Sequence, residues 1–313
     1  MDTQLGDPRT ITPHEFETMR AFVDTPHGQI AYVERGRGPV ALFIHGALLS
    51  GYQWRHQLSG LSDLRRVIAL DTLGMGHTRV RPGQSLALRD QAAMFRAFLD
   101  ALDIAEVDLV GNDSGGGAAQ IFAARNPGRI RTLTLTNCEV DDHDDRNPAF
   151  TRFRDSVASG SLARALQAAA TRPDIGRKAF AAAYQHPEAI PDDAIRTYAA
   201  PLVASPERVE LMTRYVASIT KRDLIEIRAE LAALPAPTLV LWGNADGFFP
   251  VAMAHWLRDH LARVTEVVEL DGARVFWPEE RPAWLNAKLR EHWLHDGGSE
   301  ATRTAADVGL TAR

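Results

Sequence analysis

The amino-acid sequence predicts an α/β fold: a mostly parallel eight-stranded sheet with helices on both faces and an inserted helical cap. Two observations carry this prediction. From about residue 17 onward, short apolar segments typical of strands alternate with helical patterns, as they do when helices connect parallel strands. Between Glu139 and about Leu231 the alternation stops, and alanine- and arginine-rich helical segments interrupted by prolines take its place.

The expected strands are short and strongly apolar, which is typical of strands buried on both faces of a sheet. They fall at 18–24, 28–34, 39–44, 66–70, 107–110, 132–136, 237–242 and 265–270, and the first two are separated by Pro-His-Gly as in an antiparallel hairpin. Helical patterns fall near 51–62, 86–102, 114–126, 251–263 and 279–294. The two polar ends, 1–14 and 297–313, are predicted to be loose tails.

The long helical insertion divides the chain into predicted domains. Residues 1–139 and 232–296 form the core, 140–231 the helical cap, and 297–313 a disordered tail. We expect the cap to lie over the carboxyl ends of the strands, because ligands bind at that edge of open α/β sheets.

Net charge and cysteine content limit which binding partners and metal sites the protein can have. The net charge of −5 gives no basic surface for nucleic acid or anionic lipid. Cys138 is the only cysteine, so neither an internal disulfide nor a cysteine-based metal site can form. The polar amino terminus lacks a signal-peptide core, and no apolar segment approaches membrane-spanning length. We therefore expect a cytoplasmic monomer or homodimer acting on a small molecule without cofactor or metal, and the preference for arginine over lysine suggests a GC-rich bacterial genome.

The clearest chemical motif is Gly111-x-Asp113-x-Gly115, where an apolar strand runs into a glycine-rich turn and a helix. This is the spacing of a nucleophile elbow with aspartate at the reactive position. The helix amino terminus favours the carboxylate form of Asp113. Ser114 is the rival nucleophile, but its register would place Asn112 where glycine is needed. The remaining alternative is an ordinary strand–glycine–helix turn, or a dinucleotide site, although the G-x-G-x-x-G spacing of such sites is absent.

His45-Gly46-Ala47 follows an earlier strand and extends the pattern. With FIHGALLSGYQWR (43–55), ALDTLGMGHT (69–78), LVGNDSGGG (109–117), PTLVLWGNADGFFP (237–250) and ELDGARVFWPEERP (269–282), the chain resembles the α/β-hydrolase superfamily. The similarity is to the branch of haloalkane dehalogenases and epoxide hydrolases, and it covers everything except the tails and the cap.

The resemblance implies roles for several residues. Backbone N–H groups of Ala47 and Ser114 are expected to face a developing negative charge on the substrate, while His45 is expected to fix its loop. Asp246 falls at the position of the triad acid, although an aspartate in such a loop can also be a turn residue. Glu139 is a second candidate, since some dehalogenases carry their acid after the corresponding strand.

The sequence departs from the family where its histidine base is expected. Val275 occupies that position, followed by Phe276 and Trp277, and no histidine occurs between His260 and His292. An aspartate nucleophile forms an ester that a histidine-activated water normally breaks. Without this base, attack on an electrophile remains chemically available but release of the ester is expected to stall.

Residues that bind the leaving group in this branch of the superfamily also differ in this chain. Halide-binding members have an amide side chain after His-Gly and an indole after the nucleophile, whereas this chain has Ala47 and Ser114. Tyrosines of the cap protonate the oxygen in epoxide hydrolases; here Tyr184, Tyr198 and Tyr215 are candidate donors, or simply packing residues. The acidic run 139–145 is more typical of a solvated loop than of a metal site.

Two classes of function fit these observations. One is an enzyme that uses Asp113 for hydrolase-type chemistry on an epoxide, halide or ester, or for lyase, cyclase or isomerase chemistry. The other is a catalytically retired hydrolase fold that binds a small apolar ligand under its cap. The retained elbow and Asp246 favour the enzyme.

Overall fold

A computed structural model describes residues 10–141 and 147–295. Its centre is a nine-stranded sheet of order β1-β2-β4-β3-β6-β7-β8-β9, with β5 paired to β2. The pairs from β4 through β3 to β9 are parallel, whereas β2 is antiparallel to β1, β4 and β5. The strands are β1 Ala21–Thr25, β2 Gly28–Arg35, β3 Val40–Ile44, β4 Arg66–Leu70, β5 Arg79–Val80, β6 Val107–Asn112, β7 Ile130–Thr136, β8 Thr238–Gly243 and β9 Val264–Leu270.

The predicted mostly parallel sheet is confirmed, with one strand more than expected. The additional strand, β5, has only two residues, which is too short for a period-2 pattern. The amino-terminal region also differs, because helix α1 (Pro13–Met19) occupies part of the predicted tail and the beginning of the predicted first strand. Thr12 and Glu15 form a reciprocal capping box that starts this helix.

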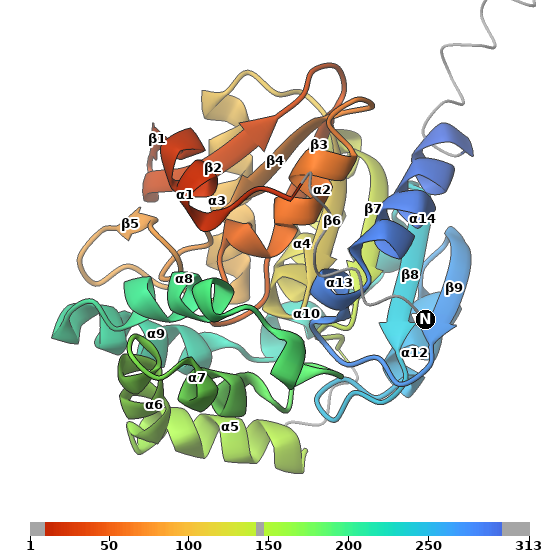
Figure 1. Ribbon diagram of the computed structural model, residues 1–313. Coiled ribbons are helices and arrows are strands. Elements are labelled where there is room, and N and C mark those ends of the chain that lie inside the picture. Colours follow the sequence, from red (N-terminus) through yellow and green to blue (C-terminus); the bar gives the residue numbers. More distant parts are fainter. Residues whose placement is uncertain (1–9, 142–146, 296–313) are drawn as a thin grey trace, which may run out of the picture.

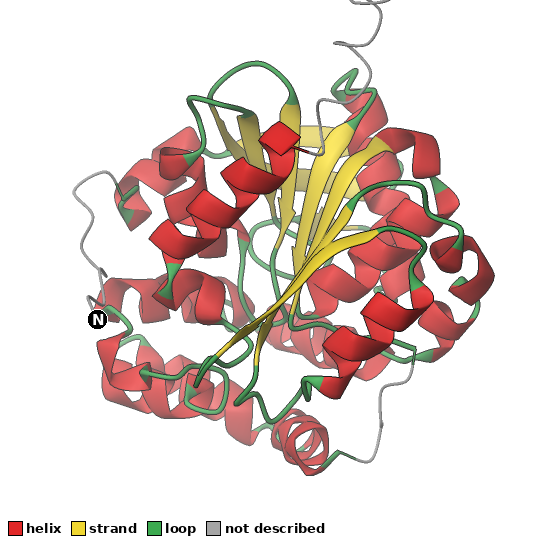
Figure 2. Ribbon diagram, turned by 90° about the vertical axis from the view of Figure 1, so that its right-hand side faces the viewer, coloured by secondary structure: helices red, strands yellow, loops and turns green. Residues whose placement is uncertain are grey.

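Helices cover both faces of the sheet (Figure 2). Strands β3, β6 and β8 are buried along their whole length, as expected for strands covered on two sides. The covering helices and 3₁₀ turns are η1 Gly51–Trp54, α2 Arg55–Gly60, α3 Leu88–Ala101, α4 Ser114–Arg125, η2 Pro127–Arg129, α12 Ala252–His260, α13 Trp277–Glu280 and α14 Pro282–His295. None of the described helices is long and apolar enough to cross a membrane.

Between β7 and β8 every regular element in the described residues is a helix or a 3₁₀ turn. Helices α5 to α9 contact one another and gather at one end of the sheet, in the lower part of Figure 1. Helices α10 and α11 contact α4 instead, so this end of the predicted cap packs on the core. The elements are α5 Pro148–Ala158, α6 Ser161–Ala169, α7 Pro173–Phe180, η3 Pro187–Ala189, α8 Asp192–Leu202, α9 Pro206–Ser218, α10 Arg222–Ile225 and α11 Arg228–Ala232.

Candidate active site

Asp113 lies in the sharp turn between β6 and α4. Its φ of 53° and ψ of −134° belong to a sparsely populated backbone region, which is a typical form of strain at functional sites. The flanking glycines make the turn possible. A Cβ on Gly115 would lie 2.5 Å from the carbonyl oxygen of His45, and one on Gly111 would lie 2.7 Å from the Cα of Gly116. The turn therefore requires the two glycines that the motif supplies.

One oxygen of the Asp113 carboxyl is held by the loop after β3. The backbone N–H of Ala47 donates a 2.7 Å hydrogen bond to Oδ2 of Asp113. In this structure the N–H of Ala47 thus faces the carboxyl of Asp113. Attack through Oδ1 would leave Oδ2 as the carbonyl oxygen of an ester on Asp113. The same N–H group would then stabilise the negative charge that develops on Oδ2 during hydrolysis of that ester.

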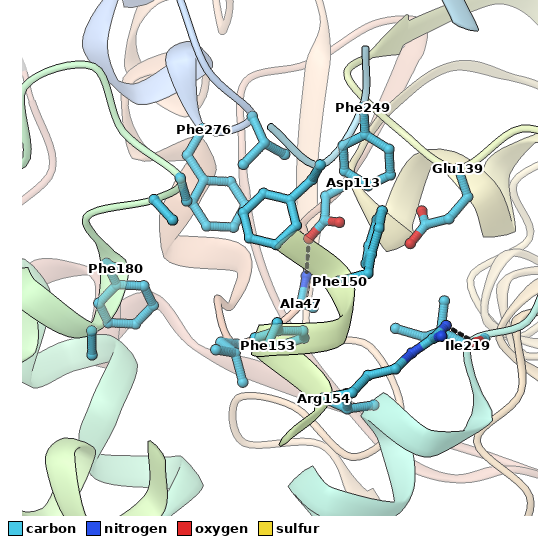
Figure 3. A pocket seen from close by; sticks show the side chains of 17 residues that line it. Ala47, Asp113, Glu139, Phe150, Phe153, Arg154, Phe180, Ile219, Phe249 and Phe276 are labelled. Atoms are coloured by element: carbon cyan, nitrogen blue, oxygen red, sulfur yellow. Dashed lines mark hydrogen bonds between the residues drawn. The ribbon is translucent and has the colours of Figure 1, made fainter. Parts of the chain in front are cut away.

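The Asp113 carboxyl opens into a cavity of about 70 Å³ between the cap and the loops that follow the strands (Figure 3). Seventeen side chains of the described residues line it, and among these only Asp113, Glu139 and Arg154 are charged. The others are Ala47, Leu48, Phe150, Phe153, Ala179, Phe180, Ala182, Ala183, Val216, Ile219, Phe248, Phe249, Val275 and Phe276. Such a lining suits a small, mostly apolar molecule approached by a few polar groups.

Burial sets the protonation of the two carboxyls in the cavity. It raises the pKa of Asp113 to about 7, against the lowering effect of the Ala47 N–H; nearby Asp246 raises the pKa further, and the Ser114 N–H lowers it. Burial also raises the pKa of Glu139 well above its usual value, and the neighbouring Asp113 adds to this. The site therefore holds protons that exposed carboxyls would have lost at neutral pH.

Asp246 follows β8 and is not among the residues that line the cavity. Its Oδ2 accepts a 2.9 Å hydrogen bond from the side-chain amide of Asn137, and its Oδ1 accepts one from the backbone N–H of Phe248. Burial raises the pKa of Asp246 to about 7, partly offset by these two hydrogen bonds. Asp246 thus combines a turn-type backbone hydrogen bond with a side-chain partner in the loop that follows the neighbouring strand β7.

Asn137, which the sequence reasoning missed, connects the loops of the site. It directly follows β7, and its side chain exchanges hydrogen bonds with the backbone of Gly243. Its Oδ1 also accepts a 3.1 Å bond from the indole N–H of Trp277. The position of Asn137 at the carboxyl end of a buried strand was the signal that could have identified it.

The position expected for the base is apolar in the structure. Val275 and Phe276 line the cavity, and no described histidine does. Asn112 fixes this loop by donating a 2.9 Å hydrogen bond to the carbonyl oxygen of Val275. His45 is buried beneath the site, where its Nδ1 donates to the carbonyl oxygen of Gly46 and its Nε2 accepts from the N–H of Thr72. Both ring nitrogens of His45 are thus engaged with backbone.

None of the three cap tyrosines considered as donors lines the cavity. Tyr184 and Tyr198 both donate to the buried carboxylate of Glu279, which also pairs with Arg55. The hydroxyl of Tyr215 is 2.8 Å from that of Ser114, so the serine side chain is engaged with the cap. Tyr184 and Tyr198 therefore tie the cap to the core in this structure. Of the acidic run 139–145, residues 142–145 lie outside the described residues.

Further lining residues could not be identified from motifs. Phe150, Phe153 and Arg154 come from α5, and the Arg154 guanidinium lies over the Phe150 ring and donates to the carbonyl oxygen of Ile219. Phe248 and Phe249 follow Asp246 and make edge-on contacts with Phe150. Helical spacing in the cap does not show which of its aromatic residues face the cavity.

Comparison with known proteins identifies the family. The family model described as "alpha/beta hydrolase fold" matches residues 39–280. The chain belongs to this family. It is a hydrolase-like member of the superfamily, and the expected resemblance and fold are thereby confirmed.

Similar proteins carry several activities in their names. The 2-hydroxymuconate semialdehyde hydrolase of Pseudomonas sp. (strain CF600) is 29% identical over 252 residues, covering 74% of this chain and 78% of that protein. Haloalkane dehalogenase 2 of Mycobacterium bovis is 26% identical over 300 residues, covering 91% and 98%. Among solved structures, the 2-hydroxy-6-oxo-6-phenylhexa-2,4-dienoate hydrolase of Rhodococcus sp. strain RHA1 has a TM-score of 0.75 at 20% identity, covering 88% of this chain and 98% of that chain. At this identity the structural likeness shows the fold.

Proposed function

We propose that this protein is an enzyme that acts on a small, largely apolar molecule through Asp113. The observation that carries the proposal is the Asp113 carboxyl itself, which opens into a mostly apolar cavity and has one oxygen held by the Ala47 N–H. A binding protein for an apolar ligand would gain nothing from a strained turn that presents a buried carboxyl. The proposed enzyme works without cofactor or metal, in the cytoplasm, as a monomer or homodimer.

The reaction is either hydrolase-type with an altered base or a non-hydrolytic lyase, cyclase or isomerase reaction. Because burial raises the pKa of Asp113 to about 7, both its carboxylate and its acid form are populated at neutral pH. The carboxylate can attack an electrophilic carbon, and the acid form can deliver a proton. Both modes use the same carboxyl in the same cavity.

Simple haloalkanes are poor candidates despite the dehalogenase relatives. A departing halide needs hydrogen-bond donors, but Ala47 carries no side-chain donor and the hydroxyl of Ser114 is hydrogen-bonded to that of Tyr215. We expect negligible dehalogenation of unactivated chloroalkanes.

A second candidate is a retired hydrolase that binds a small apolar ligand. The observation in its favour is Val275, which makes the position of the family's base apolar. Under this alternative Asp113 forms no covalent adduct, and the readout of ligand binding is movement of the cap.

Intact-protein mass spectrometry separates the two candidates. The protein is exposed to panels of epoxides, activated alkyl halides and activated esters, and peptide mapping locates any added mass. The proposal expects either turnover or an adduct on Asp113 that is absent from Asp113→Asn. Inertness of the wild type toward every panel, together with saturable binding of apolar ligands, would support the retired fold instead.

A further inference from the structure

Glu139 is a buried acid in the cavity, and the chemistry expected from the sequence gives it no role. It follows β7, is only 3% exposed, and lines the same cavity as Asp113. Within the part of the chain that the structure describes, its Oε2 is buried without any hydrogen-bond partner. Figure 3 shows the carboxyls of Glu139 and Asp113 both directed into the cavity.

A buried carboxylate with one oxygen unpaired is costly, so burial favours the neutral form of Glu139, although its own backbone N–H favours the anion. The charged groups that act on Glu139 are Asp113, which favours the neutral form, and Arg154, whose opposing effect is the smallest among those acting on it. Asp113 differs, because the N–H of Ala47 bonds to one of its oxygens and stabilises the anion. When the pair loses its first proton, Asp113 is therefore the carboxylate and Glu139 the acid.

We propose that Glu139 is the acid–base catalyst that takes the place of both the missing imidazole and the cap tyrosines. This inference rests on the proposed function of Asp113. It assigns to one side chain the two proton transfers for which, among the residues that the structure describes, neither a histidine nor a tyrosine lines the cavity. The pairing of a nucleophilic carboxylate with a carboxylic acid that later becomes a base is the logic of retaining glycosidases.

The first step consumes an electrophile whose leaving oxygen needs a proton, such as a strained cyclic ether. An oxygen of Asp113 forms a bond to the ring carbon, the carbon–oxygen bond of the ring breaks, and the leaving oxygen takes the proton of Glu139. The products are a hydroxyalkyl ester on Asp113 and the Glu139 carboxylate. Glu139 has thereby become the base.

The second step restores both carboxyls. The Glu139 carboxylate takes a proton from a water molecule as the water oxygen bonds to Cγ of Asp113. The negative charge on the former carbonyl oxygen faces the N–H of Ala47. When this tetrahedral intermediate collapses, the bond from Cγ to the alkyl oxygen breaks, and that oxygen takes the proton back from Glu139. The proton left on Asp113 then passes to Glu139, so the diol leaves and the pair returns to its starting state.

Two probes separate the role of Glu139 from that of Asp113. Styrene oxide needs proton transfer to its leaving oxygen, whereas benzyl bromide, an activated halide, releases bromide as an anion that takes no proton. In the wild type we expect both probes to add their mass to Asp113, and Asp113→Asn serves as the blank. In Glu139→Gln, addition of styrene oxide is expected to slow by about 10²–10⁴-fold, the usual contribution of a general acid. Addition of benzyl bromide is expected to stay within about threefold, which also shows that the variant is folded and its nucleophile intact.

The pH profile gives a second readout. The rate of styrene oxide addition in the wild type is expected to rise as Asp113 ionises near pH 7 and to fall at higher pH as Glu139 loses its proton. Glu139→Gln removes the descending limb, which loss of a merely structural contact would not do. Equal rates of styrene oxide addition in wild type and Glu139→Gln, with benzyl bromide still reacting, would overturn the role of Glu139 while leaving that of Asp113 in place. Absence of an Asp113 adduct or turnover with either probe in the wild type would overturn both.

Discussion

Replacing Asp113 by asparagine should stabilise the protein at alkaline pH. Burial raises the pKa of Asp113 from 3.8 to about 7. A carboxyl with a raised folded-state pKa keeps its proton in the folded chain while the unfolded chain has lost it. Stability therefore falls as pH rises between these two values, by about 1.4 kcal/mol for each pH unit. The loss is complete above pH 7 and amounts to about 4 kcal/mol.

Asparagine is a nearly isosteric test of this cost. Its side-chain oxygen can accept the Ala47 N–H bond, and asparagine tolerates positive φ better than most residues. Urea unfolding of the wild type and Asp113→Asn from pH 5 to 8 should show that the stability of the variant increases relative to that of the wild type as the pH rises. The difference in the free energy of unfolding is expected to grow by about 3 kcal/mol across this range.

Asp103 provides a matched control, because it is an exposed aspartate with the same φ of 53°. Asp103→Asn changes the same chemical group at the same φ but in an exposed position, so the burial cost that Asp113→Asn relieves is absent and the two curves, variant and wild type, should run parallel. If the Asp113→Asn curve also runs parallel to the wild type, the carboxyl of Asp113 titrates normally and the reasoning from burial is wrong.

Three further substitutions test separate parts of the site. Val275→His should speed release of a trapped Asp113 ester if water and Asp246 are within reach of the new imidazole, and comparison of burst and steady-state product formation would show it. Efficient multiple turnover by the wild type would contradict the stalled ester expected from Val275. It would point to another base, which is the role assigned to Glu139. Glu279→Gln leaves the buried Arg55 without its carboxylate, so we expect urea unfolding to show a loss of about 3–5 kcal/mol; a loss below about 1 kcal/mol would show that this cluster does not hold the cap. Ser114→Ala keeps the backbone N–H and loses the hydroxyl contact with Tyr215, so we expect a stability loss of about 1 kcal/mol with adduct formation unchanged; abolished activity with Asp113→Asn still active would make Ser114 the nucleophile.

The sheet could be predicted because its signals are local. Strands such as β3 and β6 are continuous apolar segments, and the elbow carries its glycines at the spacing the turn requires. Three of the cap helices begin at a proline, since Pro148, Pro173 and Pro206 are each the first residue of a helix. Helix α1 was missed although Thr12 and Glu15 stand at the capping-box spacing, because the flanking polar residues suggested a tail.

The composition of the cavity could not be predicted, because it depends on how distant segments meet. Phe150 and Phe248 are neighbours through their rings although about a hundred positions separate them in sequence. Likewise, Tyr184 and Tyr198 looked like donors for a substrate, but the chain folds them onto Glu279. A tyrosine on a helix shows its chemistry in the sequence, whereas its partner is decided only by packing.

The valine at position 275 and the raised pKa values of the carboxyls are parts of one electrostatic arrangement. A protonated imidazole beside Asp113 would supply a positive charge and lower the pKa of that carboxyl. Val275 supplies none, and the cations that act nearby, Arg154 on Glu139 and Arg274 on Asp246, have the smaller influence. Burial therefore decides the protonation of Asp113, Asp246 and Glu139, and each holds its proton to higher pH than usual. An apolar residue at position 275 thus leaves the buried carboxyls without a neighbouring imidazolium, so that Asp113 and Asp246 can give and take protons near neutral pH and Glu139 keeps its proton to an unusually high pH.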